Sequence, residues 1–298
     1  MRIIGFLFAF LVLTALTQIG GLVLVVTLLA MRLPRLRRAS TVWRAMIAST
    51  VFIVLYGALT AFVVPPLAAR GGRVALPCLP KGDRDYAAAT PLFCLLNRNY
   101  VVPRMADLLD ALSRDVATAY PGTTTLFLDA NLPFWDGFPL LPHLSHKDGR
   151  KLDLAFYYRS PDGDYLPGAT KSPLGYWGFE QPTPGAPISC PESRLLSLRW
   201  DMDWLQPLWP DLRLDEARTR HALVWLFDNA DDYRLQRVFV EPHLAHRLNV
   251  QSPDLGFQGC RPRATTIIST SRLRTQVCPL RADRSLSLGK HIFSQACF

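Results

Sequence analysis

The chain has 298 residues, of which 49% are hydrophobic, and its formal net charge is +9. The excess of basic side chains lies between residues 32 and 44 and after Cys260, whereas residues 45–260 hold slightly more acidic than basic side chains. Binding to nucleic acid requires a basic surface on the folded domain. The distribution of charge therefore argues against nucleic acid as a partner.

Two apolar segments open the chain. Residues 3–31 contain no charged side chain, and residues 45–68 contain none either. Each segment is long enough to cross a lipid bilayer as a helix. The loop between them, 32–44, should stay in the cytoplasm because it is rich in arginine; its arginines are Arg32, Arg35, Arg37, Arg38 and Arg44. We expect a transmembrane helical hairpin over 1–68 in a bacterial inner membrane, or alternatively a signal peptide followed by a buried helix.

The rest of the chain divides by composition. Glycine and proline in 69–85 are typical of a linker. Residues 86–260 are long enough for one periplasmic domain, and 261–298 form an atypical tail that is basic and rich in serine.

The periodicity of 86–260 predicts both helices and strands. Residues 102–120 place apolar side chains on one helical face, and 123–129 and 152–158 have the composition of strands. Strands and helices do not alternate regularly. We therefore expect an α+β fold with a small antiparallel sheet, flanking helices and long loops.

Six cysteines in an exported domain are compatible with disulfide bonds. The first four can form two bridges, and the sequence leaves their pairing open; they are Cys78, Cys94, Cys190 and Cys260.

One segment carries a candidate metal site. His146 and Asp153 are seven positions apart, and Gly149 between them allows a sharp turn. A neutral imidazole and a carboxylate are ligands of Zn²⁺, and a catalytic zinc site needs a third protein ligand and an open position. On spacing alone, the alternative is a loop histidine and an unrelated surface aspartate.

The residues around this pair resemble a known motif. Pro142–Leu154 is similar to the Ser-x-His-x-x-Gly-x-x-x-Asp motif of the zinc peptidases that cut peptidoglycan, except that Leu144 stands in place of the serine. That group includes the penicillin-insensitive murein endopeptidases and the D-Ala-D-Ala carboxypeptidases. Further similarity to the endopeptidase branch occurs at Arg237–Leu244 and Gly259–Arg261. The resemblance covers 123–261, with a diverged middle.

The resemblance implies a membrane-anchored zinc metallopeptidase that hydrolyses peptide cross-links of peptidoglycan through a zinc-activated water. His146, Asp153 and a histidine near the C-terminus would hold the zinc. The partners that it implies are peptidoglycan peptides, and the hairpin adds the lipid bilayer.

The last motif of that family, Arg-His-Asp-Asp-His-x-His, is absent. After Arg261 no histidine occurs until His291. Reading the codons of residues 264–271 one base out of register can spell His-Asp-Asp-His-Leu-His-Val. We hypothesise that a frameshift near Arg261 replaced the C-terminus; the alternative is a naturally diverged tail.

With two ligands the chain as written should bind zinc weakly and have little or no activity. The competing interpretation is a non-enzymatic, membrane-anchored protein that binds peptidoglycan or acts as a scaffold and keeps a degenerate metal site.

Overall fold

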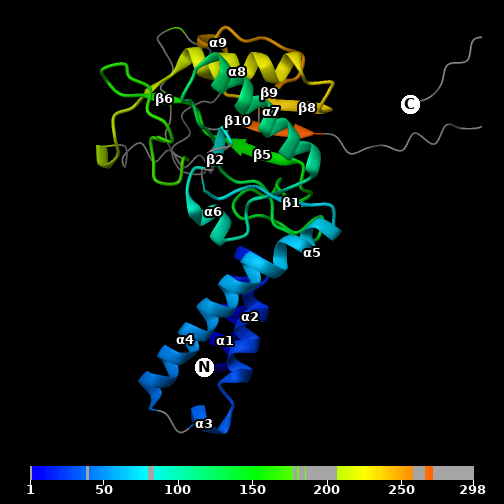
Figure 1. The fold of residues 1–298 in the computed structure, drawn as a ribbon, viewed down its shortest axis with the longest axis vertical. Coiled ribbons are helices and arrows are strands. Elements are labelled where there is room, and N and C mark those ends of the chain that lie inside the picture. Colours follow the sequence, from blue (N-terminus) through cyan, green and yellow to red (C-terminus); the bar gives the residue numbers. More distant parts are fainter. Residues whose placement is uncertain are drawn as a thin grey trace, which may run out of the picture.

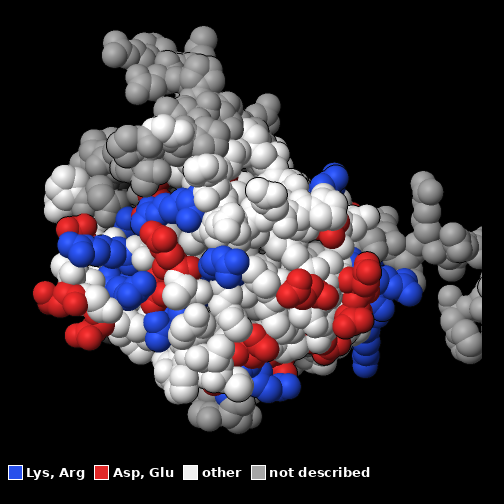
Figure 2. Space-filling model, turned by 90° about the horizontal axis from the view of Figure 1, so that it is seen from above, with Lys and Arg blue, Asp and Glu red and all other residues white. Residues whose placement is uncertain are grey.

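The computed structural model describes residues 2–37, 40–79, 84–176, 180, 185, 207–257 and 266–270. These residues form a stem of apolar helices and a mixed domain that sits on one end of the stem (Figure 1). The face of the domain farthest from the stem carries basic and acidic side chains next to one another (Figure 2).

The first apolar segment forms two helices instead of one. α1 (Arg2–Thr17) and α2 (Gly20–Ala30) are separated by Gln18, whose φ is 63°. They pack antiparallel because α2 begins with glycines: a Cβ on Gly21 would lie 2.1 Å from Thr14 Oγ1 of α1. A single span over 3–31 is therefore not confirmed, and Arg2 lies at the same end of the stem as the arginine-rich segment.

The second apolar segment forms one continuous rod. After the short α3 (Pro34–Arg37), the rod consists of α4 (Thr41–Ala58), a π-helical turn η1 (Leu59–Val63) and α5 (Val64–Arg70). The wide turn precedes Pro65 and Pro66, whose rings cannot join a regular helical hydrogen-bond ladder. Among the described residues, this rod alone is long and apolar enough to cross a membrane, since α1 and α2 are apolar but shorter.

The domain is built on a six-stranded sheet of order β2-β4-β5-β10-β8-β9. The strands are β2 (Tyr86–Ala88), β4 (Thr125–Phe127), β5 (Lys151–Leu154), β10 (Thr266–Thr270), β8 (Leu235–Phe239) and β9 (Leu255–Gly256). β5, β10 and β8 pair antiparallel, but β2 is parallel to β4 and β8 is parallel to β9. An α+β organisation agrees with the expectation, whereas a purely antiparallel sheet is wrong because both edge strands run parallel to their neighbours.

Helices and two smaller sheets complete the domain. The helices are α6 (Pro91–Leu95), α7 (Pro103–Ala119), α8 (Glu216–Asp228) and α9 (Pro242–Arg247). β1 (Val74–Ala75) pairs with β3 (Tyr100–Val101), and β6 (Tyr158–Arg159) pairs with β7 (Arg213–Leu214). α7 begins with proline, which suits the first helical turn, and it buries one apolar stripe in the core; the stripe consists of Met105, Leu108, Leu109, Leu112 and Val116.

The part of 69–85 that the structure describes packs closely into the domain. Arg73 and Leu76 are buried, and β1 belongs to a sheet. Cys78 forms a disulfide bond with Cys94, which settles the pairing of these two cysteines. Cys190 and Cys260 lie outside the described residues.

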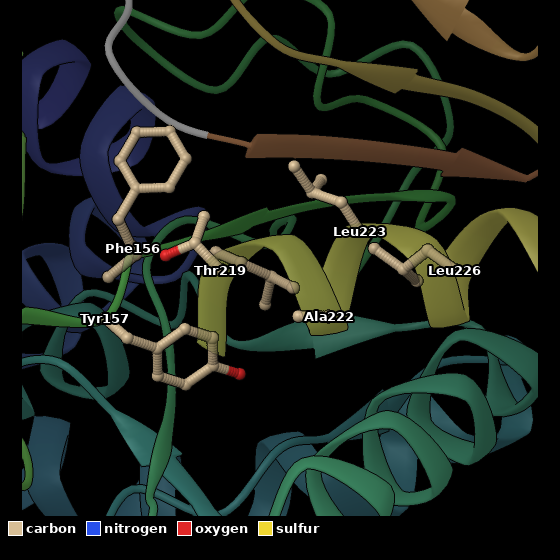
Figure 3. Close-up of a pocket in the computed structure, with 8 residues that line it drawn as sticks. Phe156, Tyr157, Thr219, Ala222, Leu223 and Leu226 are labelled. Carbon is tan, nitrogen blue, oxygen red and sulfur yellow. The ribbon is translucent and has the colours of Figure 1, made fainter. Parts of the chain in front are cut away.

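A cavity of about 20 Å³ lies between α8 and the segment that follows β5 (Figure 3). Its walls are mainly apolar and include Phe156, Leu223 and Leu226. It has room for about one water molecule and is therefore a packing void instead of a ligand site.

Candidate metal centre

The loop between β4 and β5 carries His146, and β5 itself carries Asp153. Gly149 turns this loop with a φ of 78°, and its carbonyl oxygen accepts a hydrogen bond from Val102 N at 2.8 Å. A Cβ on Gly149 would lie 3.1 Å from Val102 Cγ1. The turn therefore requires glycine both for its backbone conformation and for space.

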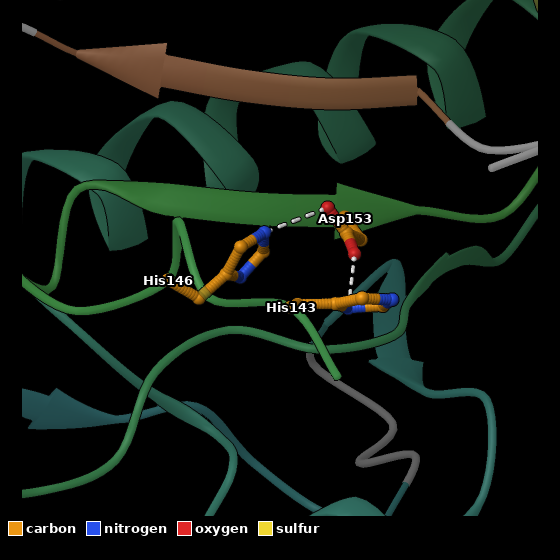
Figure 4. A group of neighbouring side chains, drawn as sticks. All are labelled: His143, His146 and Asp153. Carbon is orange, nitrogen blue, oxygen red and sulfur yellow. Dashed lines mark ion pairs between the residues drawn. The ribbon is translucent and has the colours of Figure 1, made fainter. Parts of the chain in front are cut away.

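The tautomer of His146 follows from its surroundings. The side chain is fully buried, and Nδ1 lies 2.5 Å from the carbonyl oxygen of Ala130. A carbonyl oxygen only accepts hydrogen bonds, so Nδ1 carries the proton and donates it. In the neutral ring Nε2 then has a free lone pair, and it faces Asp153 Oδ1 at 3.1 Å (Figure 4).

The two oxygens of the Asp153 carboxylate differ. Oδ2 accepts a hydrogen bond from Tyr176 OH at 2.7 Å and lies 3.2 Å from His143 Nδ1. Oδ1 has no hydrogen-bond partner among the described residues. Burial opposes the charged form, but when the imidazoles of His146 and His143 are protonated, their positive charge and hydrogen bonds hold the pKa of Asp153 well below its usual range.

His146 Nε2 and Asp153 Oδ1 are thus two buried acceptors that face each other. They lie within ion-pair distance, yet in the described part of the chain neither atom makes a hydrogen bond. Two lone pairs this close repel unless a proton or a cation lies between them. Two ligands of a tetrahedral Zn²⁺ at about 2.0–2.1 Å lie roughly 3.3 Å apart, which fits the observed separation.

A second set of charges supports Asp153. His143 Nδ1 lies 3.0 Å from Asp129 Oδ2, and Asp129 forms a buried ion pair with Arg98, whose Nη2 is 2.7 Å from Oδ2. Burial disfavours a charged imidazole, but its hydrogen bonds to Asp129 and Asp153 raise the pKa of His143 to about 9. The pKa of Asp129 is lowered, because the contacts with His143 and Arg98 outweigh the effect of burial.

His143, His146 and Asp153 together could hold a metal ion. One ligand atom from each lies within 4.8 Å of the others, and all three residues are buried. The structure therefore brings the two predicted ligands together and adds a histidine that the spacing argument did not single out. His143 stands three positions before His146, a spacing that could have drawn attention to it.

Nothing in the sequence indicated that Tyr176, Asp129 and Arg98 would lie at the centre. Tyr176 lies 23 residues beyond Asp153 in sequence, in a stretch rich in proline and glycine. Asp129 ends the expected strand 123–129, but nothing in its neighbourhood identified Arg98 as its partner.

β10 lies beside the strand that carries Asp153. Ile267 pairs with Asp153, and Ile268 pairs with Leu152 and with Val238 of β8. Residues 266–270 thus form a central strand that passes directly beside the candidate metal site.

Comparisons with known proteins provide no family for this chain: no protein-family model matches it, and no curated protein matches its sequence.

Proposed function

We propose that this chain is a membrane-anchored protein of the zinc metallopeptidase type, whose complete form acts on peptide cross-links of peptidoglycan and whose activity is impaired in the chain as written. The observation that carries the proposal is the buried pair of His146 Nε2 and Asp153 Oδ1, 3.1 Å apart and without hydrogen-bond partners among the described residues. Such a pair is the usual arrangement of two metal ligands whose other atoms are fixed by hydrogen bonds.

His146 and Asp153 are the proposed protein ligands. The carbonyl oxygen of Ala130 orients the ring of His146, and Tyr176 and His143 orient the carboxylate of Asp153. Zinc at this position would lower the pKa of a water molecule and polarise a carbonyl group. The charged imidazole of His143 keeps negative charge on Asp129 and Asp153 balanced within the buried cluster.

The frameshift hypothesis supplies the missing ligand in this proposal. The codons that can spell His-Leu-His out of register span residues 267–270, and Ile267 pairs with Asp153. In the restored frame, histidines would replace apolar and hydroxyl side chains on the strand beside Asp153. The register of β10 therefore supports the proposal that the third ligand belongs on this strand.

The membrane placement is also a proposal. We infer that the stem crosses a bacterial inner membrane with the domain in the periplasm. The length and hydropathy of Thr41–Arg70 support the crossing, and the arginine-rich segment at the other end of the stem supports the orientation.

A second candidate function is a membrane-anchored scaffold that binds peptidoglycan without cleaving it. It is favoured by the sequence of β10, Thr-Ile-Ile-Ser-Thr, which contains no metal ligand of the usual kinds in the chain as written.

Two versions of the full chain test the proposal. One is expressed from the gene as it stands, and the other from a gene with one base inserted near the codon of Arg263 so that the downstream codons spell His-Asp-Asp-His-Leu-His. Zinc content and cleavage of purified muropeptides are measured for both, with His146→Gln in the restored chain as the matched control.

The expected result is one zinc per restored chain together with cleavage, weak zinc binding without cleavage by the chain as written, and loss of both in the control. Binding of muropeptides without cleavage by the restored chain would favour the scaffold. Absence of zinc from the restored chain would contradict the proposed metal site.

A further inference from the structure

The stem and the domain are joined by hydrogen bonds between their buried polar groups. The side chain of Gln18 accepts a hydrogen bond from Phe134 N at 2.8 Å and donates one to Phe134 O at 2.9 Å. Tyr56 OH donates to Leu95 O at 2.6 Å, and Asn97 Nδ2 donates to Tyr56 OH at 3.2 Å. The domain is therefore fixed at one level along the stem.

The length of stem between its far end and the domain is small compared with the thickness of a bilayer. Tyr56 lies fifteen residues after Thr41, the first residue of α4. At 1.5 Å per residue, the helix rises about 22 Å between these two residues. The hydrocarbon core of a bilayer is about 30 Å thick, so the stem below the domain is too short to cross it alone.

The rod remains apolar beyond this level. Phe62 is 78% exposed, and Val63 and Leu67 are also exposed, although Val64 and Ala68 on another side are buried. Phe62 lies about 32 Å from Thr41 along the helix, which matches the hydrocarbon thickness. A bilayer that covers the exposed face of the rod as far as Phe62 must also reach the part of the domain that begins at Tyr56.

That part of the domain exposes large apolar side chains. Leu92 and Leu95 on α6 are exposed, and Trp135 is 66% exposed next to Phe134, the residue bound by Gln18. Tryptophan is enriched at the boundary between membrane and water. The neighbouring Asp136 forms an ion pair with Arg73 at 2.7 Å. The opposite face of the domain carries groups of basic and acidic side chains among uncharged ones (Figure 2).

We propose that Leu92, Leu95 and Trp135 form a membrane-contacting base and that this base rests in the interfacial layer of the outer leaflet. The loop that carries Trp135 continues to His143 and His146, and Gly137 N donates a hydrogen bond to Lys147 O at 2.7 Å, which ties the Trp135 turn to the segment that carries His146. The candidate metal centre is therefore held close to the membrane surface, where it meets substrates that lie next to the bilayer. This inference rests on the membrane placement that we proposed above.

The test uses the full chain in liposomes with one cysteine labelled by the polarity-sensitive fluorophore nitrobenzoxadiazole. The four cysteines outside the Cys78–Cys94 disulfide are first replaced by serine. The label is placed in turn at Trp135→Cys, at Val54→Cys on the exposed face of α4, and at Asp162→Cys in an exposed turn near β6. Quenching by aqueous iodide and by spin-labelled lipids is measured at each position.

The expected result is that lipids quench positions 54 and 135, and that iodide quenches position 135 several-fold less than position 162. If position 54 is quenched by lipids while position 135 behaves like position 162, the membrane-contacting base is wrong and the membrane placement stands. If none of the three positions is quenched by lipids, the membrane placement itself is wrong and this inference falls with it.

Discussion

The two sides of the candidate metal centre differ in the metal ligands that they supply. On the side of β5 and its preceding loop, each polar atom of Asp153 and His146 is fixed by a neighbour except the two that face each other. On the side of β10 the backbone register is in place, but the sequence Thr-Ile-Ile-Ser-Thr supplies no ligand of the usual kinds. A fold can therefore keep a strand in position while the chemistry that the strand would carry is missing.

The largest expected effect on stability comes from the buried charges next to Asp153, on the side of the centre formed by β5 and its preceding loop. Arg98→Met removes one of the two cationic partners of the buried carboxylate of Asp129 and leaves only His143, which should lower the free energy of unfolding by about 3 kcal/mol or more. Thermal unfolding in detergent micelles measures this. The matched control is Arg114→Met, which removes an exposed ion pair with Asp110 and should cost less than about 1 kcal/mol. Equal losses would contradict the role of Arg98.

The charge on His143 makes the stability of the metal-free protein depend on pH. Its pKa is about 9 in the folded protein and about 6.5 in an unfolded chain, so the folded state binds this proton more tightly. The stabilisation is complete below pH 6.5 and is lost as the pH rises to 9, with an expected size of about 3 kcal/mol. Unfolding measured from pH 6 to 10 should show this fall, and His143→Gln should flatten it. An unchanged slope in the variant would exclude His143 as the source.

A smaller effect is expected where a residue orients a ligand without binding the metal. Tyr176→Phe removes the hydroxyl that donates to Asp153 Oδ2 and should weaken zinc binding by the restored chain about 10–100-fold. Competition with a chromogenic chelator measures the affinity. Tyr165→Phe removes a tyrosine hydroxyl that contacts Thr124 and should leave the affinity unchanged. A loss in both variants would indicate a general loss of packing.

The smallest effect concerns the turn that brings His146 back to β5. Gly149→Ala and Gly122→Ala have nearly the same backbone strain, with φ of 78° and 79°, and each should cost about 1–2 kcal/mol. Only Gly149 has close neighbours, because Val102 Cγ1 would lie 3.1 Å from the added Cβ. Gly149→Ala should therefore destabilise the protein more than Gly122→Ala in thermal unfolding. An equal loss of stability would show that Val102 moves away from the added Cβ without cost.

The sequence predicted the parts of the fold that depend on local pattern. The apolar stripe of α7 and the turn at Gly149 follow from local spacing, and the pairing of His146 with Asp153 was predicted from their spacing together with the resemblance to a known motif. The break at Gln18 was missed because a uniformly apolar segment has no periodicity that marks a turn.

Long-range contacts within the site were also beyond the reach of local pattern. Tyr176 and Arg98 come from segments that meet the centre only after folding, so no spacing pointed to them. The position of β10 between β5 and β8 likewise depends on strand pairing over more than a hundred residues, which the sequence does not encode locally.

The most direct test of the central claim is the zinc affinity of the full, metal-depleted chain with single substitutions at the two proposed ligands. His146→Gln and Asp153→Asn are compared with His221→Gln, which alters a histidine–carboxylate pair away from the centre, with Nε2 2.6 Å from Asp115 Oδ2. We predict that the first two variants lose the site that the parent chain has, while His221→Gln keeps it. Parent-like zinc binding by His146→Gln would contradict the claim that His146 and Asp153 form a metal site.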